Sequence, residues 1–190
     1  MGDALRLTQE MNVQWVFVGK GSLQHPSIQR LAQQLPRRTK IREVHVGEQI
    51  GKELSLQVLA PSFEGKGENE DSLVLKTTIK GQHFLFTGDL DQAGERSLLR
   101  QYPNLQADVL KVGHHGSRTS TDPDFIKQLS VKEAIISCGR KNQFKHPHPE
   151  VLDTLVHAGV TIYRTDVSGM IRYEWSRDKQ MATRWLADED

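Results

Sequence analysis

Short apolar runs alternate with amphipathic segments along most of the chain. Apolar runs rich in β-forming residues occur at 14–19, 107–113 and 133–139, and segment 54–61 alternates apolar and polar positions. Segments with helical spacing follow at 25–36, 91–102, 122–130 and 148–159. This alternation of strands and helices predicts an α/β fold.

The sequence predicts antiparallel strands in the middle and at the end of the chain. Segment 72–90 predicts a hairpin that turns at 80–82 and ends in a Thr-Gly-Asp turn. The preceding segment, 62–71, is glycine-rich and charged, which predicts a loop. The tail predicts two or three antiparallel strands over 161–186, with turns at 168–169 and 177–178.

The composition excludes few classes of protein or partner. The chain has 190 residues with 36% hydrophobic content, which predicts a single domain over 1–190. Its net charge of +1 does not favour nucleic acid, membrane or an acidic substrate as the partner. A single cysteine, Cys138, excludes an internal disulfide framework and a cysteine-based zinc finger. The sequence shows no apolar run of membrane-spanning length and no signal-peptide pattern, so we expect a soluble chain.

The candidate site residues follow the ends of predicted strands. In α/β folds, the loops at these ends are exposed and held on a rigid sheet, which suits a functional site. Asp89 follows the second strand of the hairpin, where it could serve a site or merely cap the next helix. His114 and His115 lie between Gly113 and Gly116. On an extended strand their side chains would point to opposite faces, but the glycines predict that the chain has left the strand. Site residues and buried, hydrogen-bonded histidines remain open alternatives for this pair.

A third loop carries His146 and His148, separated by one proline. Residues two apart in an extended segment face the same way, so both imidazoles could converge on one ion or one phosphate. Arg140 and Lys145 lie beside them, and their positive charge favours an anionic substrate over a cation. A mixed metal and phosphate site fits both facts, and ordinary loop surface is the alternative.

A covalent nucleophile is not supported by the sequence. Ser117 lacks the G-x-S-x-G turn of hydrolases. Cys138 lies at the end of an apolar run, where a structural thiol is the more common case.

Several motifs agree in order and spacing with one family. TGDL, then LKVGHHGS beginning at residue 110, then HPHP, then YRTDVSG resemble the carboxyl-terminal metallo-β-lactamase-like domain of the ComEC family of competence DNA-internalisation proteins. The resemblance covers roughly 13–173. It implies an αββα sandwich that holds one or two divalent metal ions, Zn²⁺ or Mn²⁺, and hydrolyses phosphodiesters.

The resemblance also implies roles for single residues. Asp89 is similar to the carboxylate that bridges two metals, and His115 to a late-motif ligand, with His114 either its neighbour or a ligand of its own. His146 and His148 match a loop for which phosphate binding or proton donation is at least as plausible as metal ligation. The remaining substrate-binding candidates are Ser117, Ser120, Arg140 and Lys145, of which the serines would bind phosphate or orient the histidines.

One family motif is absent from this sequence. The H-x-D-x-D-H ligand cluster does not occur, and the opening residues resemble the family segment that directly follows it. We therefore expect an N-terminally truncated domain, the carboxyl-terminal part of a larger protein, with weak or no metal binding and little nuclease activity. We also expect an uncovered sheet face or edge that could cause self-association, partly covered by a helix through Ala4, Leu5, Leu7 and Met11.

Two hypotheses about function follow. In the first, the chain belongs to a metal-dependent hydrolase of DNA, attached in the full-length protein to a channel in the bacterial cell membrane that takes up single-stranded DNA. In the second, it is a non-catalytic remnant that binds nucleic acid or a protein partner through basic residues. Those residues are Arg37, Arg38, Lys40, Arg42 and the loop 140–145. A solvated basic face and a small-molecule hydrolase are the remaining alternatives.

Overall fold

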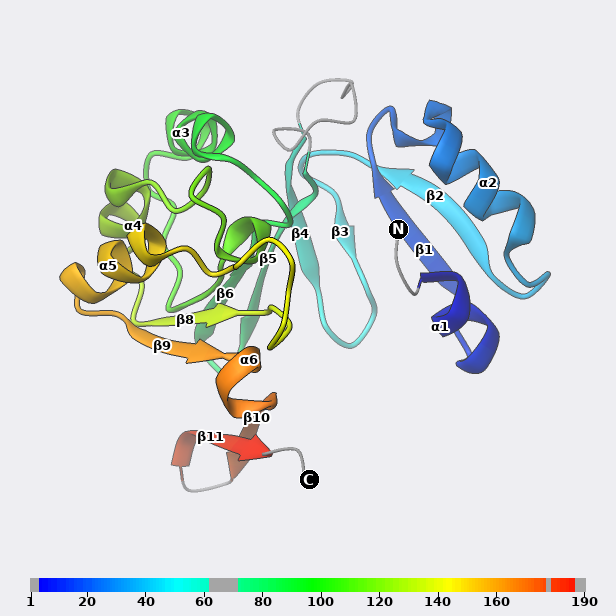
Figure 1. Cartoon of the computed structure of the whole chain (residues 1–190). Helices are drawn as coiled ribbons and strands as arrows, with labels where there is room; N and C mark the ends of the chain where they lie inside the picture. Colours follow the sequence, from blue (N-terminus) through cyan, green and yellow to red (C-terminus); the bar gives the residue numbers. More distant parts are fainter. Residues whose placement is uncertain (1–3, 62–71, 177–178, 187–190) are drawn as a thin grey trace.

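The structure, a computed structural model, describes residues 4–61, 72–176 and 179–186, with side chains up to residue 175. The predicted loop 62–71 and the predicted turn 177–178 lie outside the described residues. Within those residues the chain forms a seven-stranded sheet, two two-stranded sheets and six α-helices (Figure 1). The predicted α/β class is confirmed. No helix among the described residues is long and apolar enough to cross a membrane.

The amino-terminal elements are α1 (Ala4–Glu10), β1 (Trp15–Gly19), the 3₁₀ helix η1 (Ser22–Gln24), α2 (Pro26–Gln34), β2 (Lys40–Val44), β3 (Gln49–Ile50) and β4 (Leu56–Ala60). The central elements are β5 (Val74–Ile79), β6 (Gln82–Phe86), α3 (Gln92–Gln101), β7 (Val109–Lys111), the 3₁₀ helix η3 (Gly113–Gly116), α4 (Pro123–Leu129) and β8 (Glu133–Ile136). The chain continues with α5 (Pro149–His157), β9 (Thr161–Arg164), α6 (Thr165–Ser168), β10 (Met170–Ser176) and β11 (Lys179–Leu186). Of the strands, β2 and β3 were not predicted from the sequence.

The large sheet changes direction at its centre. Its strands lie in the order β3-β4-β5-β6-β7-β8-β9, antiparallel from β3 to β6 and parallel from β6 to β9. The β5–β6 hairpin turns at Lys80 and Gly81, as predicted, and both residues have positive φ. Parallel neighbours need crossover connections, and α3, α4 and α5 supply them.

The tail was predicted only in part. The hairpin β10–β11 is antiparallel, as expected. The first tail strand, β9, instead pairs in parallel with β8, so the antiparallel prediction was wrong for it. The physical reason is that α5 carries the chain back to the end of the sheet at which β8 begins. The strand β9 therefore runs in the same direction as β8 and completes a β-α-β unit.

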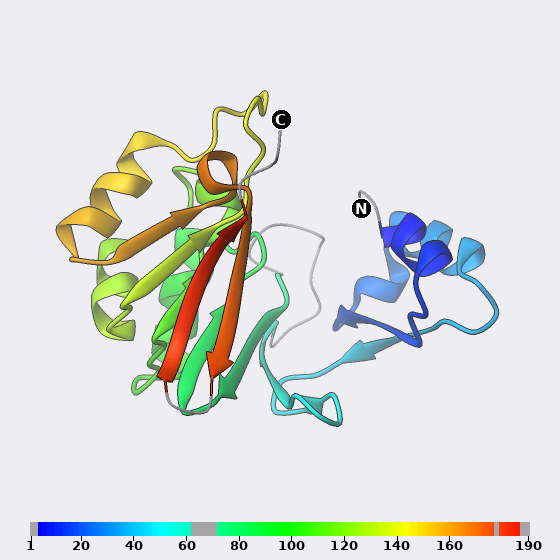
Figure 2. The same ribbon diagram turned by 90° about the horizontal axis from the view of Figure 1, so that it is seen from below.

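Other elements pack on both faces of the large sheet. Its core contacts helices on one face through Leu85, Leu110, Ala134, Leu98, Phe125 and Leu155. Side chains alternate along a strand, so Phe84 points to the other face, where its ring meets Tyr173 edge-on with centroids 5.5 Å apart. The Tyr173 hydroxyl donates to Glu133 Oε2 at 2.9 Å. The hairpin β10–β11 therefore lies across the face opposite α3–α5 (Figure 2).

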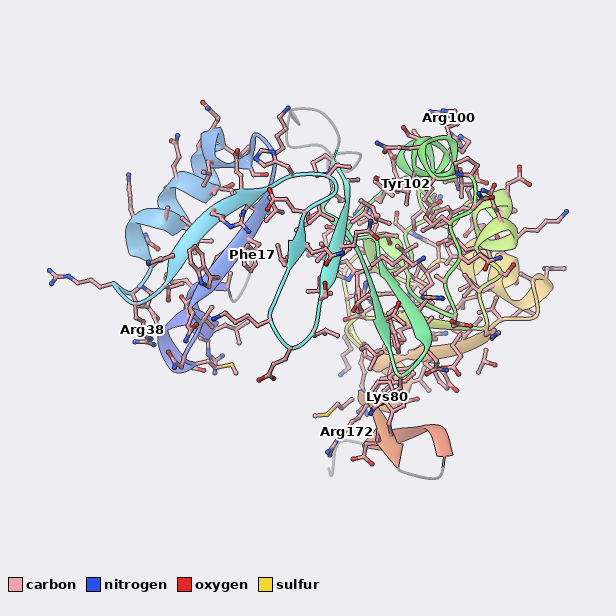
Figure 3. The ribbon with its side chains drawn as sticks, turned by 180° about the vertical axis from the view of Figure 1, so that it is seen from behind. Phe17, Arg38, Lys80, Arg100, Tyr102 and Arg172 are labelled. Atoms are coloured by element: carbon pink, nitrogen blue, oxygen red, sulfur yellow. The ribbon has the colours of Figure 1, made fainter. Side chains whose placement is uncertain are left out.

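The amino-terminal elements form a smaller unit beside β3 and β4. Its strands β1 and β2 are parallel, and the unit stands to one side of the large sheet in both ribbon views (Figures 1 and 2). Phe17 of β1, labelled in Figure 3, packs against the buried cluster of Val44, Ile50 and Val58. This second apolar cluster joins the unit to the β3–β4 hairpin.

Helix α1 does not bury the residues that its apolar pattern predicted. Leu7 is 49% exposed and Met11 58% exposed, whereas Thr8 is buried, so the prediction was wrong for those two residues. The reason is Arg38, whose guanidinium donates to the backbone carbonyls of Thr8, Gln9 and Met11. This contact satisfies carbonyls at the end of the helix and joins that end to the segment that carries Arg38.

Candidate metal and phosphate site

The candidate residues lie at one edge of the large sheet. Strands β6, β7 and β8 are parallel, so the loops that follow them leave from the same edge. The loop after β6 carries Asp89, η3 after β7 carries His114 and His115, and the loop after β8 carries His146 and His148. Parallel pairing thus brings residues that are 25 to 59 positions away from Asp89 in the sequence to one place beside it.

Asp89 and His115 form the closest pair of this group. His115 Nε2 lies 3.7 Å from Asp89 Oδ1, and both side chains are about half exposed. His115 Nδ1 lies 2.7 Å from the carbonyl oxygen of Ser137. A carbonyl only accepts, so Nδ1 carries a proton, and in the tautomer that this contact selects the lone pair is on Nε2, which faces the carboxylate. Metal-binding histidines are commonly held in this way.

The two histidines have left the strand, as predicted. His114 has φ 47° and His115 has φ 57°, both in the left-handed region. The His114 amide donates to the carbonyl of Gly88 at 3.0 Å, which joins η3 to the Asp89 turn. Backbone strain in non-glycine residues persists only where the surroundings hold it, and here the adjoining loop does so.

Two glycines allow the three loops to approach closely. A Cβ on Gly113 would lie 2.9 Å from the carbonyl oxygen of Leu90, in the loop of Asp89. A Cβ on Gly116 would lie 2.6 Å from the Pro147 Cβ, and Gly116 also has φ 80°. The Gly116 carbonyl accepts from the His148 amide at 2.9 Å. Glycine at both positions is therefore required by close packing, and at Gly116 also by conformation.

His146 and His148 lie side by side, with ring centroids 4.9 Å apart, and His114 lies 5.7 Å from His146. His148 Nδ1 accepts from the Arg118 amide at 3.1 Å, so the neutral His148 carries its proton on Nε2. Burial lowers the pKa of His146, and the neighbouring histidines lower it further, while Asp89 opposes them. His146 is accordingly neutral near pH 7.

The residues present fit a divalent metal only in part. Asp89 and His115 offer an oxygen and a nitrogen donor of the kind that Zn²⁺ and Mn²⁺ accept. Within the part of the chain that the structure describes, no group of three or more His, Cys, Asp or Glu residues is arranged to hold a metal ion. A catalytic zinc commonly has three protein ligands. The described residues alone therefore do not make a complete metal site.

The predicted serines lie inside the histidine loop. Ser117 is 6% exposed, and its Oγ lies 3.1 Å from Thr119 Oγ1. Ser120 is 1% exposed, and its Oγ lies 2.9 Å from the carbonyl oxygens of both Gly113 and Ser117. Of the two roles considered for Ser120, this geometry suits holding the histidine loop in position.

Glu95 of α3 fastens the same loop, and sequence reasoning missed it. Its Oε1 and Oε2 accept from the amides of Thr121 and Asp122 at 2.8 and 2.7 Å. The side chain is 1% exposed, and burial raises the pKa of Glu95 to about 8 although both amide donors lower it. A signal was present in the sequence, since Glu95 lies three residues before Leu98 on the apolar side of its helix.

Lys111 was also missed. It ends β7, two residues before η3 begins, and its Nζ donates to the Val112 carbonyl at 2.8 Å. Burial lowers the pKa of Lys111, while the negative charge of Asp89 acts to raise it. The signal was a lysine within an otherwise apolar strand. Lys111 places a positive charge beneath the candidate site.

The loop after β8 is held by one side chain. Asn142 Nδ2 donates to the carbonyls of Gly139 and His146 at 2.8 and 2.7 Å, and Asn142 Oδ1 accepts from the His146 amide at 2.8 Å. Outside this clasp the predicted residues Arg140 and Lys145 are exposed. Phe144, which was not predicted, is 63% exposed. The clasp thus presents an aromatic ring and basic residues on an ordered loop.

Much of the other basic segment is occupied by internal contacts. Arg38 binds the end of α1, and Arg42 Nη1 lies 2.8 Å from Glu48 Oε2. Lys40 and Arg42 also lie over the rings of Trp15 and Phe17, at 5.5 and 5.3 Å from the centroids. These contacts leave this segment less suited to bind nucleic acid than the loop 140–145.

Cys138 is a poor nucleophile in this environment. Burial, together with a hydrogen bond to the Asp166 carboxylate, raises the pKa of its thiol to about 11. The thiol therefore remains protonated near pH 7, which agrees with a structural role.

Comparisons with known proteins agree with the motifs. A family model described as the metallo-beta-lactamase superfamily matches residues 8–140. The chain is 38% identical to ComE operon protein 3 of Bacillus subtilis over 178 residues, which is 92% of this chain and 23% of that protein. It is 39% identical to competence protein ComA of Neisseria gonorrhoeae over 118 residues, 62% of this chain and 17% of that protein. It is 35% identical to Recombination protein 2 of Haemophilus influenzae over 127 residues, 66% of this chain and 16% of that protein.

The chain spans less than a quarter of the length of each of these relatives. The resemblance to competence proteins of the ComEC family, inferred from four short motifs, is confirmed by these matches. The family match covers more than half of the chain. The protein belongs to the metallo-β-lactamase superfamily.

Proposed function

We propose that this chain is part of a metal-dependent phosphodiester hydrolase, the nuclease domain of a competence-type DNA uptake protein. The observation that carries the proposal is the Asp89–His115 pair, with Nε2 3.7 Å from the carboxylate, next to the His146–His148 pair. Carboxylate and imidazole donors beside a basic loop suit a metal and a phosphate together. The name of one relative, competence protein ComA, supports competence as the setting.

We further propose that the 190 residues alone bind metal weakly and cleave DNA little or not at all. Two donors are fewer than a tightly bound catalytic metal requires. Zn²⁺ or Mn²⁺ is the metal that the donor chemistry suits, and further ligands would have to complete its coordination. His114 is a candidate for one of them, although its ring lies next to His146.

The remaining residues would act on the phosphate. His148 carries its proton on Nε2, from which it could donate to a phosphate oxygen or a leaving group. His146 lies 4.9 Å away, centroid to centroid, and could donate or accept at the same phosphate. Arg140 and Lys145 supply positive charge for the DNA backbone, and Ser117 and Ser120 keep the histidine loop in place.

The setting is also a proposal. The relatives are more than four times longer than the matched segment, so we propose that this domain is a soluble appendage of a bacterial membrane protein. Its partners would be single-stranded DNA and a channel formed by the rest of that polypeptide.

Calorimetric titration of the chain with Zn²⁺ and Mn²⁺, together with cleavage of a labelled oligonucleotide, tests the proposal. We expect weak metal binding that Asp89→Ala and His115→Ala each abolish. Asp153→Ala and His157→Ala, which remove the same side-chain types from the exposed surface of α5, are matched controls and should bind metal normally. Unchanged metal binding in Asp89→Ala and His115→Ala would refute the proposed site.

The alternative is a non-catalytic domain that binds nucleic acid or a protein partner. The observation in its favour is the incomplete ligand set among the described residues. This alternative requires that DNA binding persist in EDTA and that no metal support cleavage, even in a longer polypeptide that contains this domain.

A further inference from the structure

We propose that Phe144 is a stacking platform for one unpaired nucleobase, so that the site accepts single-stranded rather than duplex nucleic acid. The inference rests on the proposed function, since it names the part of the substrate held next to the phosphodiester. No sequence motif pointed to Phe144.

The first observation is the exposure of the ring. Phe144 is 63% exposed, although most large aromatic side chains of a folded domain are largely buried. One side of the ring stacks on His146, with centroids 5.7 Å apart and planes 25° apart. The exposed remainder is an apolar surface of the kind on which bases stack.

The second observation is that the loop is held in shape. Asn142 binds the backbone on both sides of Phe144, through the Gly139 carbonyl and through the His146 amide and carbonyl. The Lys145 amide also donates to the Asn142 carbonyl at 3.2 Å. A platform that is already ordered loses little conformational entropy when a ligand binds.

The third observation is the charge around the ring. Lys141 and Lys145 flank Phe144 and are exposed, and segment 139–149 contains no Asp or Glu. A basic loop around an aromatic ring matches the two needs of a single-stranded ligand, contact with phosphates and stacking of a base.

The fourth observation is the position of the ring relative to the site. His146 stacks on Phe144 on one side and contacts His148 and His114 with ring centroids 4.9 and 5.7 Å away. A base on Phe144 would therefore place its neighbouring phosphate close to the histidines. Bases within a duplex are covered on both faces by their neighbours, so only an unstacked base can use this surface.

The exposed Trp15 is a weaker candidate for the same role. Its ring already stacks on Phe17, with centroids 6.1 Å apart, and the Lys40 ammonium lies over it. It also lies in the amino-terminal unit rather than on the histidine loops. Trp15 therefore supplies a matched control, because it is an exposed aromatic residue beside a cation.

Fluorescence anisotropy of end-labelled oligonucleotides, measured in EDTA so that metal plays no part, tests the inference. The probes are an oligothymidylate, an abasic strand of equal length and a duplex of equal length. Phe144→Leu should weaken binding of the oligothymidylate roughly tenfold, leave the abasic strand unaffected, and remove the preference over duplex. Phe144→Trp should retain binding, and Trp15→Leu should bind like the natural sequence.

The outcomes separate this inference from the proposed function. If Phe144→Leu binds the oligothymidylate as tightly as the natural sequence, or if neither protein binds it, the platform does not exist, whatever the metal titration shows. If base-dependent binding is lost in Phe144→Leu while Asp89 and His115 prove irrelevant to metal, the platform stands and the hydrolase proposal fails. A loss that is equal for the oligothymidylate and the abasic strand would also overturn the inference, because it would show a contact with the backbone.

Discussion

His115 is held between two groups from different loops, with Nδ1 donating to the Ser137 carbonyl at 2.7 Å and Nε2 facing Asp89 Oδ1 at 3.7 Å. The carbonyl sets the tautomer and the direction of the ring, so the lone pair of Nε2 and the carboxylate converge on one point. Neither group is adjacent to His115 in the sequence. The pair is a product of parallel strand pairing.

Zinc should stabilise the protein through this pair. A ligand that binds only the folded state raises the melting temperature by mass action. We expect Zn²⁺ to give a small upward shift in a thermal denaturation series, and His115→Gln and Asp89→Asn to remove it. His157→Gln, which alters an exposed histidine of α5, should keep the shift. An equal shift in all four proteins would contradict the assignment of the pair.

Glu95→Ala should destabilise the domain substantially. The substitution leaves the amides of Thr121 and Asp122 buried without an acceptor and opens a cavity beside the histidine loop. We expect the free energy of unfolding to fall by about 2–4 kcal/mol. Urea denaturation measures this loss, and Glu10→Ala, at an exposed position of α1, serves as the neutral control. A loss as small as that of the control would show that Glu95 does not anchor the loop.

Glu95 should also make stability depend on pH. Burial raises the pKa of Glu95 to about 8 in the folded protein, above the usual value of 4.5. The folded state then binds more protons than the unfolded state between these values, so its stabilisation is complete below about pH 4.5 and is lost as the pH rises to about 8. The slope contributed by this group should be at most about 1.4 kcal/mol per pH unit. Urea denaturation at several pH values should show this slope, and Glu95→Gln should lack it.

Gly116→Ala should lower the free energy of unfolding by more than the strain of an alanine with positive φ alone would. A Cβ there would meet Pro147 at 2.6 Å, whereas at Gly159, also with positive φ, it would meet no heavy atom of the described residues within 4 Å. Gly159→Ala should cost about 1 kcal/mol from backbone strain, and Gly116→Ala clearly more, because the histidine loops must separate. Equal losses in urea denaturation would show that the loops tolerate the added methyl group.

The exposed apolar residues of the amino-terminal unit should cause weak self-association. Trp15 is 44% exposed, and Leu7 and Met11 are exposed beside it in the sequence. Among the described strands, β1 pairs with β2 alone and so leaves one edge open. In sedimentation velocity, the sedimentation coefficient should rise with protein concentration, and Trp15→Lys should reduce this rise. A sedimentation coefficient that stays at the monomer value at all protein concentrations would contradict this prediction.

The sequence by itself determined the local elements and the chemistry of the loops. Apolar periodicity located most strands and helices, and glycines on both sides of His114 and His115 showed that the chain leaves the strand there. These features could be predicted because they depend on residues close together in the chain. The candidate residues Asp89, His115 and His146 were found for the same reason.

Only the tertiary structure decided which of these residues meet and which side chains are already engaged. Parallel pairing of β9 with β8, the capture of Arg38 by the end of α1, and the anchoring of the loop at 121–122 by Glu95 all join segments at least 25 residues apart. The exposure of Phe144 depends likewise on how the loop packs against His146. Such contacts follow from the packing of the whole sheet and its helices, and local periodicity carries no information about them.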